Sequence, residues 1–273
     1  MSAAIVLRGG ERQPGVDPMD RGLAYGDGVF ETLLVHDGAP VWWQAHWQRL
    51  QRGAERLGFN APDEGAVRGH AMALLADAPP RGVLKLIVTR GGAARGYAPS
   101  PQGEPTVVLS VHPAPVDPGP VALRWCELRW SLQSRLAGVK HLNRLEQVLA
   151  RAEWTDPAIF EGLVLEAGGA VASATAANVF ARRNEEWLTP PVESCGIAGL
   201  MRDWVLAHAP GARVATFSPA DLLAADEVFL CNAVRGILPV RRIDGRVWEA
   251  WAATTALRRQ LAAAEPGFTF QED

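Results

Sequence analysis

The chain has 273 residues, 48% of them hydrophobic and 21% charged, which is typical of a globular protein with one large or two moderate domains. Its net charge of −3 and the lack of a basic stripe argue against a nucleic-acid partner. No apolar run is long enough to cross a bilayer, and the start lacks the layout of a secretion signal, so we expect a cytoplasmic protein.

The first part of the chain alternates β-branched runs with two amphipathic helical patterns. Strands are predicted at 28–36, 40–43, 83–89 and 105–111, and helices at 45–57 and 65–76. Proline is then too dense, from Pro113 to Pro120, to continue a helix or a central strand. We therefore expect a small N-terminal α/β domain over residues 1–113 and a linker over 114–120.

The second part predicts a larger C-terminal domain over residues 121–273. Strands are predicted at 122–130, 162–165, 178–182, 227–232 and 238–243, and helices at 142–153, 199–209 and 248–264. A turn at Gly168-Gly169 indicates a hairpin. Hairpins and meanders mixed with helices favour an α+β architecture of two α/β domains over one doubly wound sheet.

One lysine has an unusual position. Lys140 follows a turn of small apolar residues and precedes a helical pattern that would bury Leu145, Val148 and Leu149 on one stripe. Lys140 would then lie near the end of an element and face whatever cavity the turn borders. A single lysine is more often a solvated surface residue, so its interpretation depends on other segments.

Three segments have features of anion binding. Ser194–Arg202 is a glycine-bracketed turn that leads into a helix, whose free N–H groups and dipole suit a phosphate. Asn232–Gly236, at the end of a strand, would add donors, and Arg49 lies in an amphipathic helix. Taken singly, such a turn is more often a plain helix cap and such an arginine a surface charge.

The cysteine and histidine patterns do not indicate a metal site. Cys126, Cys195 and Cys231 are widely spaced without a CxxC pair, and the six histidines show no HExxH spacing. One thiol must remain unpaired in any intrachain scheme. Buried, inert thiols are favoured over a free thiol beside a bound ligand.

Seven segments, in order, resemble the class IV aminotransferase-like family, the fold-type IV pyridoxal phosphate enzymes. These segments are Asp20–Thr32, His46–Leu50, Thr89–Tyr97, Lys140–Gln147, Ala176–Phe180, Gly196–Arg202 and Cys231–Val240. Within the family, the string Lys-His-Leu-Asn-Arg-Leu-Glu-Gln and the Cys-Asn-Ala opening of the last segment look like the aminodeoxychorismate lyases. Arg235-Gly236-Ile237 stands where the transaminases tend to have Thr or Ser followed by Glu-Val.

The resemblance implies a homodimer whose subunits each enclose pyridoxal 5'-phosphate in the cleft between two domains. Lys140 would be the catalytic residue and would bind the cofactor covalently. The cofactor phosphate would be held by Arg49, the backbone amides of Ile197 and Ala198, Asn232 and Ala233. Arg95 is the candidate clamp for a substrate carboxylate, and Tyr25, His141 and Asn143 are candidates for lining the substrate pocket. A solvated loop charge, for Arg95, and helix-start residues, for His141 and Asn143, remain as alternatives.

Ser173 departs from the family pattern. It lies five residues before Asn178, where the family normally has a glutamate that bonds the pyridine nitrogen and keeps it protonated. A serine would meet an unprotonated nitrogen and weaken the cofactor as an electron sink, unless the nearby Glu166 compensates. An elimination that ends in an aromatic product tolerates this better than a transamination.

The implied function is thus the conversion of 4-amino-4-deoxychorismate to 4-aminobenzoate and pyruvate, in folate biosynthesis. The alternatives are a D-amino-acid or branched-chain aminotransferase on the same fold, and a pyridoxal phosphate-binding protein without catalysis.

Overall fold

The computed structural model describes residues 3–92, 96–99 and 103–270. The chain forms two compact units, one of residues 1–115 with 140–143 and the other of residues 116–139 with 144–273. The proline-rich segment expected as a linker spans the first boundary. The sequence placed Lys140 in the C-terminal domain, whereas in the structure residues 140–143 belong to the first unit because their backbone pairs with one of its strands.

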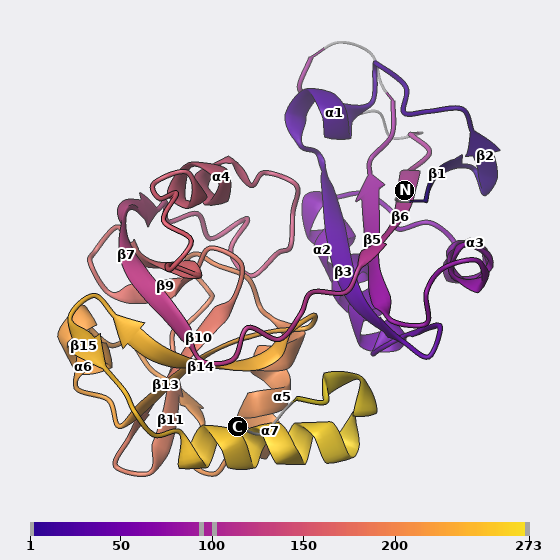
Figure 1. Ribbon diagram of the computed structural model, residues 1–273. Coiled ribbons are helices and arrows are strands. Elements are labelled where there is room, and N and C mark those ends of the chain that lie inside the picture. The colour runs from indigo at the N-terminus through magenta and orange to yellow at the C-terminus, as the bar shows by residue number, and fades with distance from the viewer. Residues whose placement is uncertain (1–2, 93–95, 100–102, 271–273) are drawn as a thin grey trace. The chain divides into compact units, whose positions relative to one another are not determined.

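The first unit is built on one antiparallel sheet of six strands in the order β2-β1-β6-β5-β3-β4 (Figure 1). The strands are β1 (Ala4–Arg8), β2 (Glu11–Gln13), β3 (Gly28–His36), β4 (Ala39–Pro40), β5 (Gly82–Thr89) and β6 (Thr106–Pro113). Its helices are α1 (Arg21–Tyr25), α2 (Trp43–Leu57) and α3 (Glu64–Ala76). The strand expected at 40–43 is wrong, because the chain turns at Trp42 in a left-handed conformation and α2 already begins at Trp43.

Strand β3 has two different faces, as alternation along a strand requires. Helix α2 packs against β3, and the side chains of Val29, Glu31, Leu33 and Val35 are buried. Phe30 and Thr32 point to the opposite face and are only half-buried. The sheet therefore has a covered face and a more open face, and the residues between 28 and 32 alternate between them.

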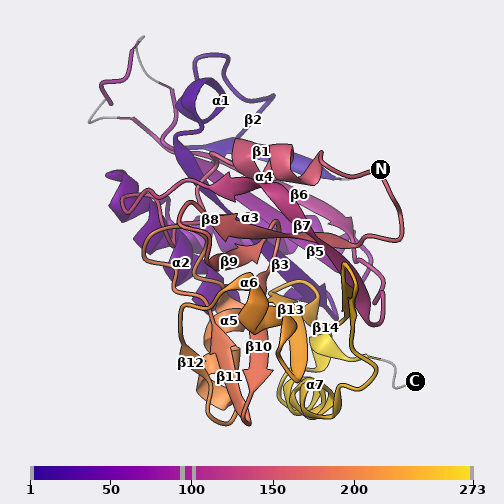
Figure 2. The same cartoon turned by 90° about the vertical axis from the view of Figure 1, so that its left-hand side faces the viewer.

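The second unit contains a mixed sheet in the order β12-β11-β10-β13-β14-β7-β8-β9, with β15 paired to β14. Its strands are β7 (Val121–Trp130), β8 (Glu161–Glu166), β9 (Val171–Ala174), β10 (Asn178–Arg183), β11 (Glu186–Thr189), β12 (Arg213–Val214), β13 (Glu227–Asn232), β14 (Gly236–Ile243) and β15 (Arg246–Val247). The helices are α4 (Leu145–Arg151), α5 (Leu200–His208), α6 (Pro219–Leu223), α7 (Ala252–Ala264) and a 3-10 turn at Pro266–Phe268. Helices α5 and α7 pack against β13 (Figure 2). Two antiparallel-rich units of strands and helices confirm the expected mixed α and β fold.

Helix α4 differs from its prediction in length and in burial. It begins at Leu145 instead of 142, and the apolar side chains expected to be buried are exposed: Leu145 by 69%, Val148 by 60% and Leu149 by 54%. The periodicity correctly identifies one apolar face, but it does not say what covers that face. None of the helices formed by the described residues is long and apolar enough to cross a membrane.

Candidate functional site

Lys140 is fixed by a short stretch of backbone pairing with the start of β3. The amide of Phe30 donates to the Lys140 carbonyl at 3.0 Å, and the amide of Leu142 donates to the Gly28 carbonyl at 2.9 Å. A Cβ atom at position 28 would lie 2.8 Å from the Leu142 side chain and 2.5 Å from the Val88 carbonyl, so only glycine allows this approach. The Asp27-Gly28 sequence thus provides the place where the lysine segment docks.

The lysine side chain lies on the open face of the sheet. Its Nζ atom is 4.2 Å from the centroid of the Phe30 ring. A second ammonium group approaches the same ring, because Lys85 of β5 pairs with Thr32 and places its Nζ 5.8 Å from the Phe30 centroid. Two lysines, a phenylalanine and a threonine hydroxyl therefore gather on this face. Sequence reasoning missed Lys85, although it is the only charged residue of β5.

On the covered face, Arg49 belongs to a buried charge network. Its Nε donates to Glu31 Oε1 at 2.8 Å and its Nη2 donates to Oε2 at 2.5 Å, while His46 Nδ1 lies 2.6 Å from Oε2. Burial would raise the pKa of Glu31, but the charge and hydrogen bonds of Arg49, helped by His46, outweigh it and lower the pKa to about 2. Glu31 is therefore an anion that holds Arg49 by two parallel bonds.

His46 itself is kept mainly neutral. Burial lowers its pKa, and the charges of Arg49 and Lys140 act in the same direction, against the opposing effect of Glu31. Its Nε2 atom is buried without a hydrogen-bond partner among the described residues. Glu31 and His46 were not singled out from the sequence as site residues, and the signal was the Phe-Glu-Thr stretch beside Gly28.

The turn before α5 has the features expected of an anion site, with one difference. Gly196 has a φ of 83°, and Asn178 of β10 holds the turn by donating from Nδ2 to the Ile197 carbonyl at 3.1 Å. The Ala198 amide donates to the Gly138 carbonyl at 3.1 Å, so it is already used, whereas the Ile197 amide has no acceptor among the described residues. Helix α5 begins at Leu200, and its N-cap residue Gly199 has no side chain to cap it, which leaves first-turn N–H groups for an anion.

The turn after β13 is organised by one side chain. Asn232 Oδ1 accepts from the amides of Val234 at 3.0 Å and Arg235 at 2.9 Å, and its Nδ2 donates to the Ala176 carbonyl at 3.2 Å. Ala233 lies inside this turn. The Asn232 side chain is thus used to shape the turn, so any contribution to an anion would come from the backbone.

Ser173 is buried on β9 and receives a hydrogen bond from the indole nitrogen of Trp130 at 2.9 Å. Glu166 does not take its place, because its carboxylate accepts from the amides of Gly168 and Ala170 in the hairpin turn. Glu161 has a raised pKa because of burial, and it accepts from the Thr175 hydroxyl at 2.5 Å. Both neighbouring carboxylates are therefore committed to the loops on either side of β9.

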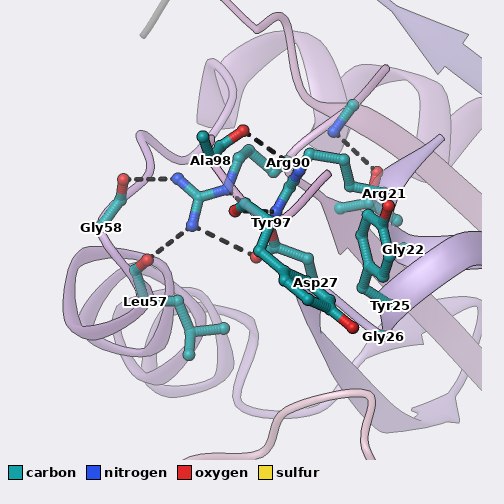
Figure 3. A network of polar contacts seen from close by, with 12 residues as sticks. Arg21, Gly22, Tyr25, Gly26, Asp27, Leu57, Gly58, Arg90, Tyr97 and Ala98 are labelled. Carbon is teal, nitrogen blue, oxygen red and sulfur yellow. Dashed lines mark hydrogen bonds and ion pairs between the residues drawn. The ribbon is translucent and has the colours of Figure 1, made fainter. Parts of the chain in front are cut away.

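Two buried arginines share one aspartate in the first unit (Figure 3). The Nε atoms of Arg21 and Arg90 both donate to Asp27 Oδ2 at 2.8 Å. Burial would raise the pKa of Asp27, but the two arginines lower it. Arg90 also donates from Nη2 to Asp27 Oδ1 at 3.2 Å and from both terminal nitrogens to the carbonyls at the C-terminal end of α2. The terminal nitrogens of Arg21 donate to the carbonyls of residues 96–98.

The candidate substrate residues of the first unit lie around this network. Tyr25 accepts from the Gly96 amide at 3.3 Å through its hydroxyl, and Asn143 donates to the Gly26 carbonyl at 3.0 Å. His141 Nδ1 accepts from the Asn143 amide at 3.2 Å. Arg95 lies outside the described residues, directly before the segment that Arg21 holds.

The three cysteines are buried and unpaired. Burial raises the pKa of Cys126 to about 12 and of Cys195 to about 11, and it raises the pKa of Cys231 further still. These are the properties of inert thiols.

Comparisons with known proteins identify the family. The family described as "Amino-transferase class IV" matches residues 28–243. Aminodeoxychorismate lyase of Vibrio harveyi is 36% identical over 82% of this chain and 86% of its own length. A putative branched-chain-amino-acid aminotransferase of Methanocaldococcus jannaschii is 32% identical over 87% of this chain and 85% of its own.

The solved structures give the same picture. The crystal structure of 4-amino-4-deoxychorismate lyase from Pseudomonas aeruginosa is 42% identical, with a TM-score of 0.88, and the match covers 96% of this chain and 99% of that one. A putative 4-amino-4-deoxychorismate lyase of Legionella pneumophila has a TM-score of 0.83 at 26% identity. The chain belongs to the class IV aminotransferase family.

Proposed function

We propose that the protein is a pyridoxal phosphate-dependent carbon–oxygen lyase that converts 4-amino-4-deoxychorismate to 4-aminobenzoate and pyruvate. The observation that carries this proposal is the nearly full-length likeness to the Pseudomonas aeruginosa lyase. It is supported by the position of Lys140 on the open face of the first sheet. The lyase strings that the sequence contains point the same way.

The residues present fit the cofactor. Lys140 would hold it covalently beside the start of β3, where its charge also reaches His46 of the Arg49 network. Arg49, the Ile197 amide and the backbone at Asn232 and Ala233 would hold its phosphate. The Ala198 amide, predicted as a further donor, bonds the Gly138 carbonyl instead. A preorganised arginine and an uncapped helix start are the donors that a phosphate dianion requires. When bound, the cofactor supplies an electron sink next to the amine-bearing carbon of the substrate.

The side chains of this protein would then move protons and hold charges. Once the substrate amine has taken its place on the cofactor, the freed amine of Lys140 would accept the proton from the amine-bearing carbon, in the role of general base. The bond between the ring carbon and the enolpyruvyl oxygen would break, its electron pair would leave with enolpyruvate, and the ring would become aromatic. Enolpyruvate would take a proton, which the Lys140 ammonium group can return, and become pyruvate. The substrate has two carboxylates, for which Lys85 is a candidate partner and Arg95 a second. Tyr25, His141 and Asn143 are the candidates for lining the pocket.

An aminotransferase acting on D- or branched-chain amino acids is the second candidate function. The 32% identity to the Methanocaldococcus jannaschii protein favours it. Ser173 argues against it, because amino-group transfer needs a stronger electron sink than an elimination. A protein that binds the cofactor without catalysis is the third outcome to be tested.

One assay separates these functions. Purified protein loaded with pyridoxal phosphate should release pyruvate and 4-aminobenzoate in equal amounts from aminodeoxychorismate without any 2-oxo acid. Lys140→Ala should abolish this turnover and the borohydride trapping of the cofactor on the chain. Conversion of the cofactor to its amine form by alanine would instead support the aminotransferase, and bound cofactor with neither reaction would support the non-catalytic protein.

We further propose a cytoplasmic homodimer that serves folate biosynthesis. The support for a dimer is the apolar face of α4, where Leu145, Val148 and Leu149 are all more than half exposed. Exposed apolar stripes of this kind usually mark a contact with a partner. A second copy of the chain is the partner that we propose.

A further inference from the structure

The hydroxyl group of Ser173 accepts a hydrogen bond, and its own hydrogen still needs an acceptor. Trp130, at the end of β7, donates from Nε1 to Ser173 Oγ at 2.9 Å, and the two residues are 2% and 7% exposed. An indole nitrogen can only donate, so the serine oxygen must be the acceptor in this bond. The hydroxyl hydrogen must then point to some other acceptor.

No described residue supplies that acceptor. The structure contains no hydrogen bond in which Ser173 Oγ donates to another group of the described residues. The two nearest carboxylates along the neighbouring strand, Glu161 and Glu166, accept from other donors. A buried hydroxyl without an acceptor is unfavourable, and a ligand atom with a free lone pair would satisfy it.

We infer that Ser173 donates its hydrogen bond to the pyridine nitrogen of the cofactor, and that this nitrogen therefore carries no proton. This inference rests on the proposed function, which brings pyridoxal phosphate to this residue. Trp130 fixes the direction of the bond by occupying the serine oxygen.

The opposite arrangement is less favourable for two reasons. If the nitrogen were protonated, Ser173 would accept a second bond, and its own hydrogen would again lack an acceptor. A buried cationic ring also needs an anion beside it. The glutamate that supplies this anion elsewhere in the family is replaced here by a neutral residue.

An unprotonated ring nitrogen would favour elimination over amino-group transfer. A ring without a positive nitrogen withdraws electrons less strongly, which penalises reactions that must store the electron pair. Breaking the carbon–oxygen bond carries the pair away with the leaving group. Trp130 and Ser173 are thus positioning residues that favour elimination over amino-group transfer.

Nitrogen NMR of protein loaded with ring-labelled pyridoxal phosphate tests this directly. The wild-type resonance should lie in the range of neutral, hydrogen-bonded pyridine. Ser173→Ala should shift it toward neutral pyridine without a hydrogen bond, and Ser173→Glu should move it to the protonated range. Thr175→Ala, which removes a nearby hydroxyl bonded to Glu161, should leave the resonance unchanged.

The Trp130 indole provides a second readout. Its N–H resonance, identified by its absence in Trp130→Phe, should move downfield when the cofactor is loaded, because the bound nitrogen polarises the serine oxygen. In Ser173→Ala this loading shift should disappear.

The failures can be told apart. A protonated wild-type ring, or a resonance unmoved by Ser173→Ala, would overturn the inference while borohydride trapping at Lys140 leaves the proposed function intact. Absence of trapping at Lys140 would overturn both.

Discussion

Arg49 combines an observed ion pair with a proposed binding role. Glu31 takes its Nε and one terminal nitrogen, and the proposed function assigns the cofactor phosphate to the same residue. A planar fork can serve both because its donors point in different directions. The glutamate therefore orients the arginine before the phosphate arrives, which lowers the entropic cost of binding.

Removal of this arginine should weaken cofactor binding. Arg49→Ala removes a charge-assisted contact worth roughly 1.5–3 kcal/mol, so the dissociation constant of pyridoxal phosphate should rise about tenfold to a hundredfold. Arg49→Lys retains the charge but loses the planar, forked geometry of the guanidinium group. Its affinity for pyridoxal phosphate should lie between those of the wild type and Arg49→Ala. Absorbance titration of the apoprotein measures this, and an affinity equal to that of the wild type in Arg49→Ala would remove Arg49 from the phosphate site.

The buried Glu31 should make the protein sensitive to acid. Its pKa of about 2 in the folded protein lies below the ordinary value of 4.5, so its ionised form stabilises the fold at higher pH and this stability is lost as the pH falls toward 2. This lowering of the Glu31 pKa corresponds to roughly 3 kcal/mol of unfolding free energy at neutral pH.

Glu31→Gln should therefore flatten the dependence of the unfolding free energy on pH between about 5 and about 2. Urea unfolding of the apoprotein at several pH values measures it. Glu55→Gln, which changes an exposed glutamate of α2, the helix that carries Arg49, should follow the wild-type slope. An unchanged slope in Glu31→Gln would contradict the ion pair.

At the scale of elements, the start of α5 depends on the lack of a side chain at Gly199. A Cβ atom there would overlap the Asn178 carboxamide oxygen, and Asn178 is the residue that holds the preceding turn. The backbone at Gly199 has an ordinary φ of −79°, so space and not conformation requires glycine. The turn at residues 196–198, β10 and α5 therefore fit together only with glycine at position 199.

Gly199→Ala should therefore lower the unfolding free energy by about 1–3 kcal/mol through overpacking and weaken cofactor binding. Gly69→Ala is the matched control, because an added Cβ in the middle of α3 meets nothing within 4 Å. It should stabilise the protein by about 0.5–1 kcal/mol. Thermal unfolding of both variants measures this, and equal effects would contradict the steric explanation.

How far the sequence predicts these elements depends on the range of the interactions. The strand at 28–36 is predicted to the residue, because local β-branched residues and a glycine mark it. Lys85 was missed as a neighbour of Lys140, since it lies there only through the register of β5 against β3. Trp130 was missed as the partner of Ser173 for the same reason, because the two residues, 43 positions apart, meet only through the pairing of β7 with β8 and of β8 with β9.

At the scale of the whole molecule, the exposed face of α4 predicts an assembly. Val148→Glu should raise the dimer dissociation constant at least tenfold, because a two-fold interface carries the change twice and each buried valine contributes about 1.5–3 kcal/mol. Val247→Glu, at another half-exposed valine, should leave the dimer intact. Light scattering over a range of concentrations would show this, and a monomeric wild-type protein would contradict the proposal.

The sequence predicts the two-unit architecture, but it does not predict that the chain returns to the first unit at residues 140–143. Prolines mark the boundary near residue 115, and the family resemblance implies two domains. Nothing local indicates that residues 140–143 return to the first unit, since this depends on a gap left by Gly28. The exposure of α4 was missed because a periodic pattern reports a face and not its neighbours.

The return of residues 140–143 means that the gene has no single cut that separates the two units. A fragment ending at Pro115 would keep Phe30, Lys85 and the network of Glu31, His46 and Arg49, but it would lose Lys140. A fragment that begins after Pro115 would contain Lys140, but the segment around it would lack β3, with which its backbone pairs. A chimera that takes the first unit from a relative would have to include residues 140–143 as well as the first 115 residues. A swap of the first unit alone would therefore have to replace two separate stretches of the gene.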